Sequence, residues 1–417
     1  MDHFQYKEGV YHAEGVSLQA IAEKVGTPFY CYSTATLQRH VLVFASHFGG
    51  DAKVCYAVKA NSNLAVLRTL AQAGCGADVV SEGEIRLAMA AGIKPQDIVF
   101  SGVGKTAEEM RYALEQGIFQ FNVESAAELA LLNDVAKSMR KKAPVAIRVN
   151  PDVDPKTHAK ISTGQKESKF GIAMADALAL YKEAAGLAAI DVQGVSVHIG
   201  SQLTSLEPFG QAFRRLRQFI DELKAAGIAI RTVDLGGGLG IPYGQETPPQ
   251  PDSYAEVARK EMAGLDCQLM FEPGRMIVGN AGILVSKVLY VKSSATKTFV
   301  IVDAGMNDLV RPAMYDAYHE IVPVMASNEA PVPVDVVGPV CETGDLFAEG
   351  RKLPPLKASD LVAFRSAGAY GVVMACNYNA RLLPAEVMVH GDQFAVVRPR
   401  QNYEALLSRD VLPSWLG

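Results

Sequence analysis

Lys59 ends an apolar run, 54–58, and a helical pattern begins a few residues later. An amine at the mouth of a buried strand is costly to desolvate, and desolvation lowers the pKa of an amine. A lysine amine in that state can condense with an aldehyde, as in covalent catalysis. The alternative is a lysine that extends its charged end into water. The residues that follow along the chain favour the catalytic interpretation.

Ionisable residues and glycines stand at the ends of other strand-like runs. Asp78, Arg148, His198 and Glu272 occupy such positions, and the glycines 236–238 follow another run. In a parallel barrel, the C-terminal ends of the strands carry the chemistry. Core packing does not require so many ionisable groups there. We therefore interpret these residues as parts of one site.

The glycines 236–238 come after the seventh strand-like run. Consecutive glycines let backbone N–H groups converge on an anion, and barrels often bind phosphate after strands seven and eight. A flexible turn is the alternative, but this position favours a phosphate site. His198 could stack its flat ring on a bound aromatic group, and Ser201 could reach the phosphate. A histidine at a strand end is more often structural.

Glu272 and Arg275 bring a carboxylate and a guanidinium together in the segment EPGR, 272–275. One interpretation is a structural ion pair at a turn. In the other, Glu272 holds a protonated ring nitrogen and Arg275 binds a carboxylate or phosphate. A protonated ring is the stronger electron sink, which is what loss of CO₂ from an amino acid requires.

Cys341 lies in the C-terminal part of the chain, in the segment CETGD. Most cysteines in proteins are small buried hydrophobic groups. Here Glu342 and Asp345 would keep the thiol protonated, and a protonated thiol is suited to donate a proton.

The elements that must position these residues alternate between strand-like and helical patterns from about residue 34 to 275. Helical stretches separate eight apolar runs, which centre on 54–58, 78–80, 98–100, 119–123, 145–149, 195–199, 232–235 and 269–271. An open doubly wound sheet would give a similar pattern. The count of eight favours a closed parallel barrel.

After residue 280 the runs become short, rich in Val and Phe, and separated by Gly, Pro and Asn. This texture is typical of an antiparallel β domain. The run 29–32 is expected to pair with that sheet. We therefore predict an α/β chain with a TIM-type (β/α)8 barrel over 34–280. A sandwich-like or barrel-like β domain is expected from 1–33 and 281–417.

The chain has 417 residues, 49% of them hydrophobic, and a net charge of −5. This balance argues against a nucleic-acid or membrane partner, and the apolar runs are broken before they could span a bilayer. Its first residues have no apolar core typical of a signal peptide. Six cysteines without a Cys-x-x-Cys pair indicate neither a metal site nor a disulfide framework. A cytoplasmic location is expected.

Taken in this order, the motifs resemble those of the fold type III pyridoxal-phosphate-dependent decarboxylases, and among them the diaminopimelate decarboxylases. The likeness spans nearly the whole chain. It is carried by the segments YAVKAN (56–61), GADVVSEGE (76–84), KTH (156–158), SKFG (168–171), HIGSQ (198–202), GGGLG (236–240), EPGR (272–275), CETGD (341–345) and AGAYG (367–371).

The resemblance implies pyridoxal 5'-phosphate as the cofactor. It implies that Lys59 bonds covalently to the cofactor aldehyde, that His198 stacks on its ring and that Glu272 pairs with its ring nitrogen. Arg148 would support the ring or Glu272. The remaining residues expected around the cofactor are Asp78, Ser201, Gly237, Gly238, Gly274, Arg275 and Tyr370.

The resemblance also implies a homodimer with shared active sites, in which Cys341 and Glu342 of one subunit reach the site of the other. Cys341 would protonate the carbon that has lost CO₂. The expected reaction is the decarboxylation of meso-2,6-diaminopimelate to L-lysine. The far end of this substrate carries a carboxylate as well as an ammonium. Arg275, Arg311, Tyr315 and Tyr370 would bind there together with Glu342, which would take the ammonium.

Three alternatives stay open. A related decarboxylase for ornithine, arginine or lysine would need only an anionic pocket, and Arg311 beside Glu342 argues against it. An amino-acid racemase on the same barrel would place an arginine at the ring nitrogen, where this chain has Glu272. A cofactor-binding regulatory homologue without turnover would be expected to lack Lys59 or Cys341, and both are present.

Overall fold

The computed structural model describes residues 2–48, 52–155, 163 and 168–416. The chain divides into two compact units. One combines Met1–Thr36 with Val278–Gly417, and the other is Leu37–Ile277. Among the described residues, no helix is long and apolar enough to cross a bilayer.

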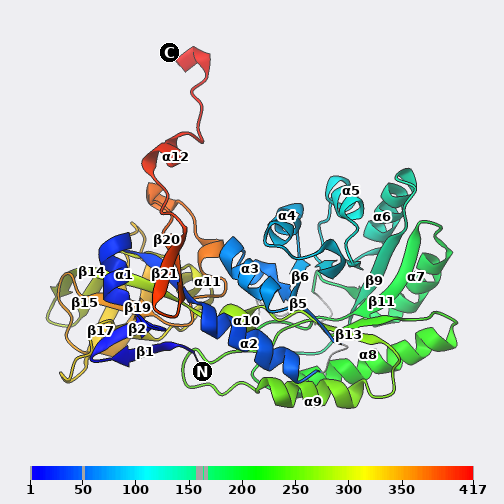
Figure 1. Cartoon of the computed structure of the whole chain (residues 1–417), viewed down its shortest axis with the longest axis horizontal. Coiled ribbons are helices and arrows are strands. Elements are labelled where there is room, and N and C mark those ends of the chain that lie inside the picture. The colour runs from blue at the N-terminus through cyan, green and yellow to red at the C-terminus, as the bar shows by residue number, and fades with distance from the viewer. Residues whose placement is uncertain (1, 49–51, 156–162, 164–167, 417) are drawn as a thin grey trace. The chain divides into compact units, whose positions relative to one another are not determined.

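Eight parallel strands form a closed barrel in the described part of the second unit (Figure 1). Each strand pairs with the next along the chain, and the last pairs with the first. This confirms the predicted TIM-type barrel. The strands are β5 (Lys53–Ala57), β6 (Gly76–Val79), β7 (Ile98–Phe100), β8 (Gln120–Val123), β9 (Ala143–Asn150), β11 (Ile190–Ser196), β12 (Thr232–Asp234) and β13 (Gln268–Phe271). A short strand, β10 (Ile172–Ala173), pairs with the end of β9.

Helices lie outside these strands (Figure 1) and begin where side chains cap them. Ser81, Thr106 and Ser125 each accept the N–H three residues on, which satisfies a helix-end donor. The helices of this unit include α3 (Leu64–Gln72), α4 (Glu82–Ala90), α5 (Ala107–Gln116), α6 (Ala126–Ser138), α7 (Met174–Gly186), α8 (Glu207–Ala225) and α9 (Pro251–Glu261). Helix α2 (Thr34–Ser46) crosses the division between the two units.

Helix α8 shows what holds a helix against the barrel. Its apolar side chains recur every three or four residues and are buried: Phe209, Phe213, Leu216, Phe219, Ile220 and Leu223. Complete burial of each such side chain stabilises the fold by about 1.5–3 kcal/mol. One face of α8 is therefore a large part of the packing in this unit.

Strand β11 differs from the prediction. The sequence suggested a strand over 195–199, but β11 begins at Ile190 and ends at Ser196. Its first half includes polar residues, among them Asp191, and pairs with β9. The pairing does not extend to His198, whose carbonyl oxygen is bound by side chains instead. Arg148 and Thr163 both bind the carbonyl oxygen of His198.

The first unit is built on a mixed sheet. Its strands are β4 (Phe29–Ser33), β14 (Gly282–Ser293), β15 (Thr298–Val302), β16 (Ile321–Pro323), β17 (Val332–Val337), β18 (Leu346–Leu353), β19 (Leu361–Phe364), β20 (Ala385–His390) and β21 (Gln393–Arg398). Most pairings are antiparallel, as predicted, whereas β4–β20 and β15–β17 are parallel. The N-terminal strand β4 lies between β14 and β20.

A small meander and one helix complete the packing of this unit. The meander is β1 (Phe4–Lys7), β2 (Val10–Ala13) and β3 (Val16–Ser17), followed by α1 (Leu18–Val25). Phe4 and Leu18 are buried there with Phe29 and Ile283 of the large sheet. The meander, α1 and the large sheet therefore share one hydrophobic core.

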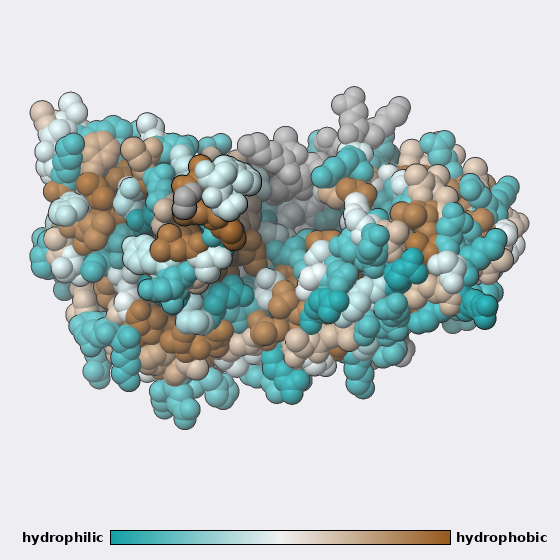
Figure 2. Space-filling view, turned by 90° about the horizontal axis from the view of Figure 1, so that it is seen from above, coloured by the Kyte–Doolittle hydropathy of each residue, from teal (hydrophilic) through white to brown (hydrophobic). Residues whose placement is uncertain are grey.

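The C-terminal arm, residues 403–416, contains α12 (Tyr403–Leu407) and the 3-10 turn η6 (Ser414–Leu416). It extends away from the sheet of its own unit (Figure 1). Leu407 is 71% exposed and Trp415 82%. Figure 2 looks at the arm end-on and shows hydrophobic side chains on its surface.

Candidate active site

Lys59 lies in a single 3-10 turn, η1 (Val58–Ala60), directly after β5. Its Nζ is 2.9 Å from Oδ2 of Asp78, a fully buried residue of β6. The other oxygen of Asp78, Oδ1, has no hydrogen-bond partner among the described residues. The Lys59 amine is therefore tied to a buried carboxylate, and its side chain stays 38% exposed.

Asp234 and Glu272 add two more buried carboxyl groups, at the ends of β12 and β13. One amide nitrogen, Nδ2 of Asn122, lies 2.9 Å from Oδ2 of Asp234 and 3.2 Å from Oε1 of Glu272. Burial, and then the charges of Asp234 and Asp78, hold the pKa of Glu272 well above its ordinary value. Burial also raises the pKa of Asp234. A positively charged partner would favour the ionised form of Glu272.

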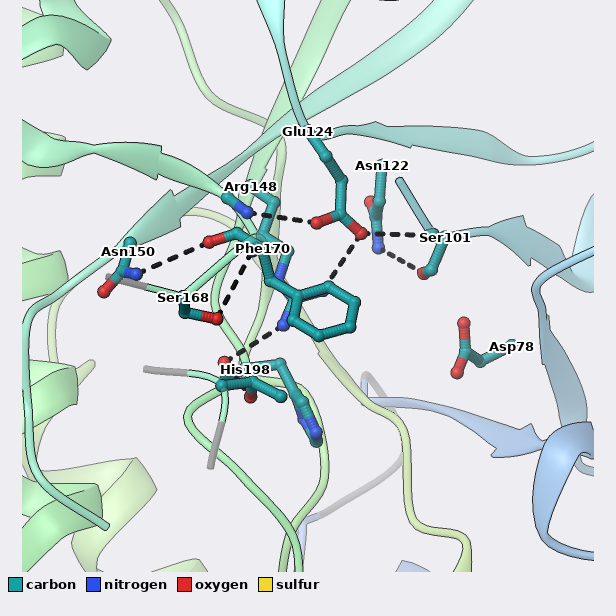
Figure 3. Close-up of polar contacts among 12 residues, drawn as sticks. Asp78, Ser101, Asn122, Glu124, Arg148, Asn150, Ser168, Phe170 and His198 are labelled. Atoms are coloured by element: carbon teal, nitrogen blue, oxygen red, sulfur yellow. Dashed lines mark hydrogen bonds and ion pairs between the residues drawn. The ribbon is translucent and has the colours of Figure 1, made fainter. Parts of the chain in front are cut away.

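Arg148, on β9, is fixed by the neighbouring strand. Its Nη1 lies 3.0 Å from Oε1 of Glu124, and its Nη2 donates to the carbonyl of His198 at 3.2 Å. Figure 3 shows the Glu124 carboxylate facing the Arg148 guanidinium. Glu124 also accepts the N–H groups of Gly102 and Gly171, at 2.9 and 3.0 Å. Arg148 was expected to support either the cofactor ring or Glu272. It makes no direct bond to Glu272, and its ion-pair partner is Glu124.

His198 is an uncharged ring at neutral pH. Its Nδ1 accepts the N–H of Gly237 at 3.1 Å, so Nε2 carries the proton in the neutral form. Burial, and then the positive charges of Arg148 and Lys59, hold the pKa of His198 well below its ordinary value. A flat neutral ring of this kind can stack on another aromatic system.

The glycine run packs directly against other backbone segments. A Cβ at Gly237 would lie 2.2 Å from the carbonyl oxygen of Glu272, and one at Gly238 would lie 2.5 Å from that of Gly200. Gly238 also has a φ of 115°, which favours glycine. No other residue fits at these two positions without backbone movement. The loop is therefore a closely packed, side-chain-free surface.

Arg275 begins the short helix α10 (Arg275–Val278) and reaches two hydroxyl groups. Its Nε and Nη2 lie 3.3 and 3.1 Å from Oγ of Ser201, and its Nη1 donates to the Tyr243 hydroxyl at 2.6 Å. A Cβ at the neighbouring Gly274 would lie 3.1 Å from Cβ of Ala57, so this segment fits tightly against the end of β5.

Cys341 and Glu342 lie in the first unit, in the loop between β17 and β18, and both are exposed. The N–H of Cys341 donates to Oδ1 of Asn379 at 2.8 Å. The carboxylate of Asp345 accepts the N–H groups of Val340 and Met306, each at 2.6 Å. Asp345, expected to act on the thiol, therefore binds the backbone of its own loop at Val340 and of the segment after β15 at Met306.

Arg311 is buried in the short helix α11 (Arg311–Tyr315), which rules out a mere surface charge. Its Nη1 is 2.8 Å from Nε2 of His319, whose Nδ1 lies 2.8 Å from the carbonyl of Arg365. The proton of the neutral His319 ring is thus on Nδ1. Tyr315 is half-buried one turn after Arg311. Tyr370 is half-buried with a φ of 55°, a strained conformation for a tyrosine.

The structure brings together most of the predicted site residues. Lys59, Asp78, Arg148, His198, Ser201, Gly237, Gly238, Glu272, Gly274 and Arg275 lie at or just beyond the C-terminal ends of the barrel strands. Cys341, Glu342, Arg311, Tyr315 and Tyr370 belong to the other unit, on separate loops and one helix. The segment 156–158 lies outside the described residues.

Sequence reasoning missed Asn122, Glu124 and Tyr243. Asn122 lies within β8 and Glu124 directly follows it, so the strand-end rule that selected Asp78 could have found both. Tyr243 carries no such signal, because it lies in a loop beyond the glycine run and is identified only by its contact with Arg275.

Comparison with known proteins shows consistent similarity. Residues 34–279 match the family described as pyridoxal-dependent decarboxylase, pyridoxal binding domain. A diaminopimelate decarboxylase of Zymomonas mobilis is 52% identical over 99% of both chains, and one of Vibrio cholerae is 50% identical over 99% of this chain and 100% of the relative.

Solved structures agree. A diaminopimelate decarboxylase of Helicobacter pylori, complexed with L-lysine, is 43% identical with a TM-score of 0.91, covering 94% of this chain and 98% of the other. That of M. jannaschii, also in complex with L-lysine, is 40% identical with a TM-score of 0.95, covering 100% of this chain and 99% of the other.

Proposed function

The chain belongs to the family of diaminopimelate decarboxylases, which are pyridoxal-phosphate-dependent enzymes, and we propose that its residues decarboxylate meso-2,6-diaminopimelate to L-lysine and CO₂. This is the last step of lysine biosynthesis. The observation that carries the proposal is the Lys59 amine, held 2.9 Å from the buried Asp78 at the mouth of the barrel.

The barrel residues fit pyridoxal phosphate by their charge. Three buried carboxyl groups, Asp78, Asp234 and Glu272, lie at the same end of the barrel as Lys59, and one oxygen of Asp78 has no hydrogen-bond partner among the described residues. A protonated ring nitrogen would supply the positive charge that this cluster favours, and Glu272 would hold it. When bound, the cofactor withdraws the electron pair left by departing CO₂. The Lys59 amine would anchor it through a covalent bond to its aldehyde.

The polar network behind the site would keep a ring in place. His198 would stack on the cofactor, with its orientation fixed by Gly237 and its carbonyl held by Arg148. Glu124 in turn holds Arg148. The phosphate would be bound by a set from several loops, namely Ser201, Gly237, Gly238, Gly274, Arg275 and Tyr370.

Substrate recognition is proposed for residues of both units. Arg275, Arg311, Tyr315 and Tyr370 would bind the far end of diaminopimelate, and Glu342 its distal ammonium. The burial of Arg311 supports a specific role for that cation. The resemblance to the family supports a homodimer in which the partner subunit's Glu342 completes the site.

Cys341 is proposed to donate the proton that replaces the lost carboxylate. Its exposed position in the β17–β18 loop supports contact with a second subunit. Whether other groups share this role is a question for the Cys341→Ser variant. The cytoplasmic location stays a prediction, which cell fractionation can test.

The decisive assay measures CO₂ release from meso-diaminopimelate, ornithine, arginine and lysine in parallel, with the protein loaded with pyridoxal phosphate. Release is expected from diaminopimelate alone. Faster release from ornithine, arginine or lysine would favour the related decarboxylases. Conversion of meso-diaminopimelate to another stereoisomer, or loss of optical activity of L-ornithine, L-arginine or L-lysine, without CO₂ release would favour a racemase. Cofactor binding without either reaction would leave the regulatory alternative.

A further inference from the structure

A turn beside the Cys341 loop holds two non-glycine residues in an unfavourable backbone conformation. The 3-10 turn η5 (Tyr378–Ala380) contains Asn379 and Ala380, each with a φ of 55°. Non-glycine residues in the left-handed region cost about 1 kcal/mol or more each, and they cluster at functional sites. Asparagine tolerates this region better than alanine does. The surrounding structure must therefore hold the turn in place.

Two side chains of this turn contact the two residues that carry the proposed chemistry of the loop. Oδ1 of Asn379 accepts the N–H of Cys341 at 2.8 Å. The Glu342 carboxylate, next to Cys341, interacts with the hydroxyl of Tyr378, next to Asn379, and this interaction raises the pKa of Tyr378. Consecutive residues of the turn thus bind consecutive residues of the loop.

Hydrogen bonds of the residues on either side of the turn fix its position, whereas the side chains of Cys341 and Glu342 in the loop are not buried. Nε of Arg381 donates to Oδ1 of the buried Asn307 at 3.0 Å, and the N–H of Cys376 donates to the Asn307 carbonyl at 2.9 Å. Nδ2 of Asn377 donates to Oε1 of Gln401 at 2.6 Å. Cys341 and Glu342 are exposed, so burial does not fix their side chains.

We propose that Asn379 and Tyr378 are positioning residues for this reaction, Asn379 for the Cys341 backbone and Tyr378 for the Glu342 carboxylate. The inference rests on the proposed function, because it assigns purpose to two contacts of that site. Asn379 would set the direction from which the thiol delivers its proton. Tyr378 would hold the carboxylate that takes the substrate's distal ammonium.

These two roles predict different kinetic defects. Loss of the Asn379 contact would affect proton delivery, which occurs after CO₂ has left, and so lower kcat. Loss of the Tyr378 contact would weaken binding of the ground state and so raise KM. A purely structural role would instead change thermal stability and cofactor content together.

The variants distinguish the effect of the strained backbone conformation from the effect of the side-chain contacts. Asn379→Gly keeps the left-handed backbone conformation at no steric cost but removes the acceptor for the Cys341 N–H. Asn379→Asp keeps both the conformation and the acceptor. Tyr378→Phe keeps the ring and removes only the hydroxyl. Tyr403→Phe is the matched control, because it removes an exposed hydroxyl elsewhere in the same unit.

Each variant, loaded with pyridoxal phosphate, is assayed for kcat and KM with meso-diaminopimelate. The product formed in D₂O is analysed for the configuration of deuterium at the carbon that lost CO₂. Asn379→Gly is expected to lower kcat about tenfold or more and to give mixed configuration, since misplaced proton donors cost such factors. Asn379→Asp should preserve a single configuration. Tyr378→Phe should raise KM about tenfold, with kcat changed less than about threefold.

Wild-type configuration in Asn379→Gly, or unchanged KM in Tyr378→Phe, would overturn the assigned role of that residue. A fall in kcat that simply tracks loss of bound cofactor or of thermal stability would also overturn it. If Asn379→Gly does not fold, Tyr378→Phe and the double variant Tyr378→Phe/Glu342→Gln still decide: the double variant should be no worse than Glu342→Gln alone. A wild-type protein inactive on diaminopimelate would overturn the proposed function itself.

Discussion

At the end of the barrel, Arg148 and Glu124 are buried and His198 is half-buried, and all three are bonded to one another or to nearby backbone. In the other unit, Cys341 and Glu342 are exposed, and single contacts from a neighbouring turn orient them. Burial shifts the pKa of His198 and Glu272, whereas the exposed pair depends on geometry. The barrel residues are thus prepared before any ligand arrives, whereas the side chains of the loop are not fixed by burial.

The largest effect is expected at Lys59. Lys59→Ala should lower activity by about 10³-fold or more, because no other group would bond covalently to the cofactor. The visible absorption of bound pyridoxal phosphate should also be lost. Lys94→Ala, which removes an exposed lysine of the same unit, is the control and should behave as wild type. Full activity in Lys59→Ala would contradict the assignment of the barrel site.

Glu272→Gln should lower activity while raising the stability of the cofactor-free protein at pH 8. Turnover is expected to fall about 10²-fold, because a neutral amide holds a protonated nitrogen far less well than a carboxylate. The cofactor-free variant should be more stable than the cofactor-free wild type at pH 8. A carboxyl group with a raised folded-state pKa stabilises the fold below its ordinary pKa, and this stability is lost as the pH rises through the raised value.

Denaturant unfolding of the cofactor-free proteins at pH 5.5 and 8 measures this difference. Glu256→Gln, at an exposed position on α9, is the control. If Glu272→Gln were less stable than wild type at both pH values, Glu272 would be a structural ion-pair member instead.

Arg311 tests the other unit. Arg311→Ala should raise KM for diaminopimelate about 10- to 100-fold, because a buried cation for the distal carboxylate is lost. Titration of pyridoxal phosphate into the apo variant should give nearly the wild-type affinity. Arg351→Ala is the matched control, because Arg351 donates to the carbonyl of the same His319. An equal rise of KM in both variants would mean that only local packing was disturbed.

The smallest expected effect concerns Glu84, on α4. Burial raises its pKa to about 7, and it accepts the N–H of Val80 at 2.8 Å. The fold keeps this proton longer than the unfolded chain, so the associated stability is present below the ordinary value of 4.5 and is lost as the pH rises through 7. As the pH rises, the free energy of unfolding of Glu84→Gln should therefore fall by about 1–3 kcal/mol less than that of the wild type.

Unfolding curves of wild type and Glu84→Gln between pH 4.5 and 8 give this slope. Parallel curves for the two proteins would show that Glu84 does not titrate differently in the folded chain. Glu256→Gln again serves as the exposed control.

The barrel was predictable because its strands are apolar and regularly spaced, and β7 has the predicted bounds, 98–100. Helices were predicted between the strands, but no bounds were predicted for α7, because its many alanines give weak contrast between its faces. The start of β11 was missed because Asp191 and Gln193 are polar residues on a half-exposed strand end.

Strand ends located Arg148 and Glu272 in the sequence, but not their partners. Arg148 and Glu124 are 24 residues apart, and only the adjacency of β8 and β9 brings them together. Asn379 and Cys341 are 38 residues apart, and both lie in irregular segments outside the strands, for which no periodic pattern exists. Partner choice depends on three-dimensional proximity, which residue spacing in an irregular segment does not encode.

Trp415 is the single tryptophan of the chain, and it projects from the C-terminal arm into water. Indole emission will therefore report poorly on unfolding of the barrel strands, which contain no tryptophan and must be followed by circular dichroism or by the bound chromophore. The same property makes the arm a built-in optical probe. A blue shift of its emission with rising protein concentration would register the moment at which another surface covers it.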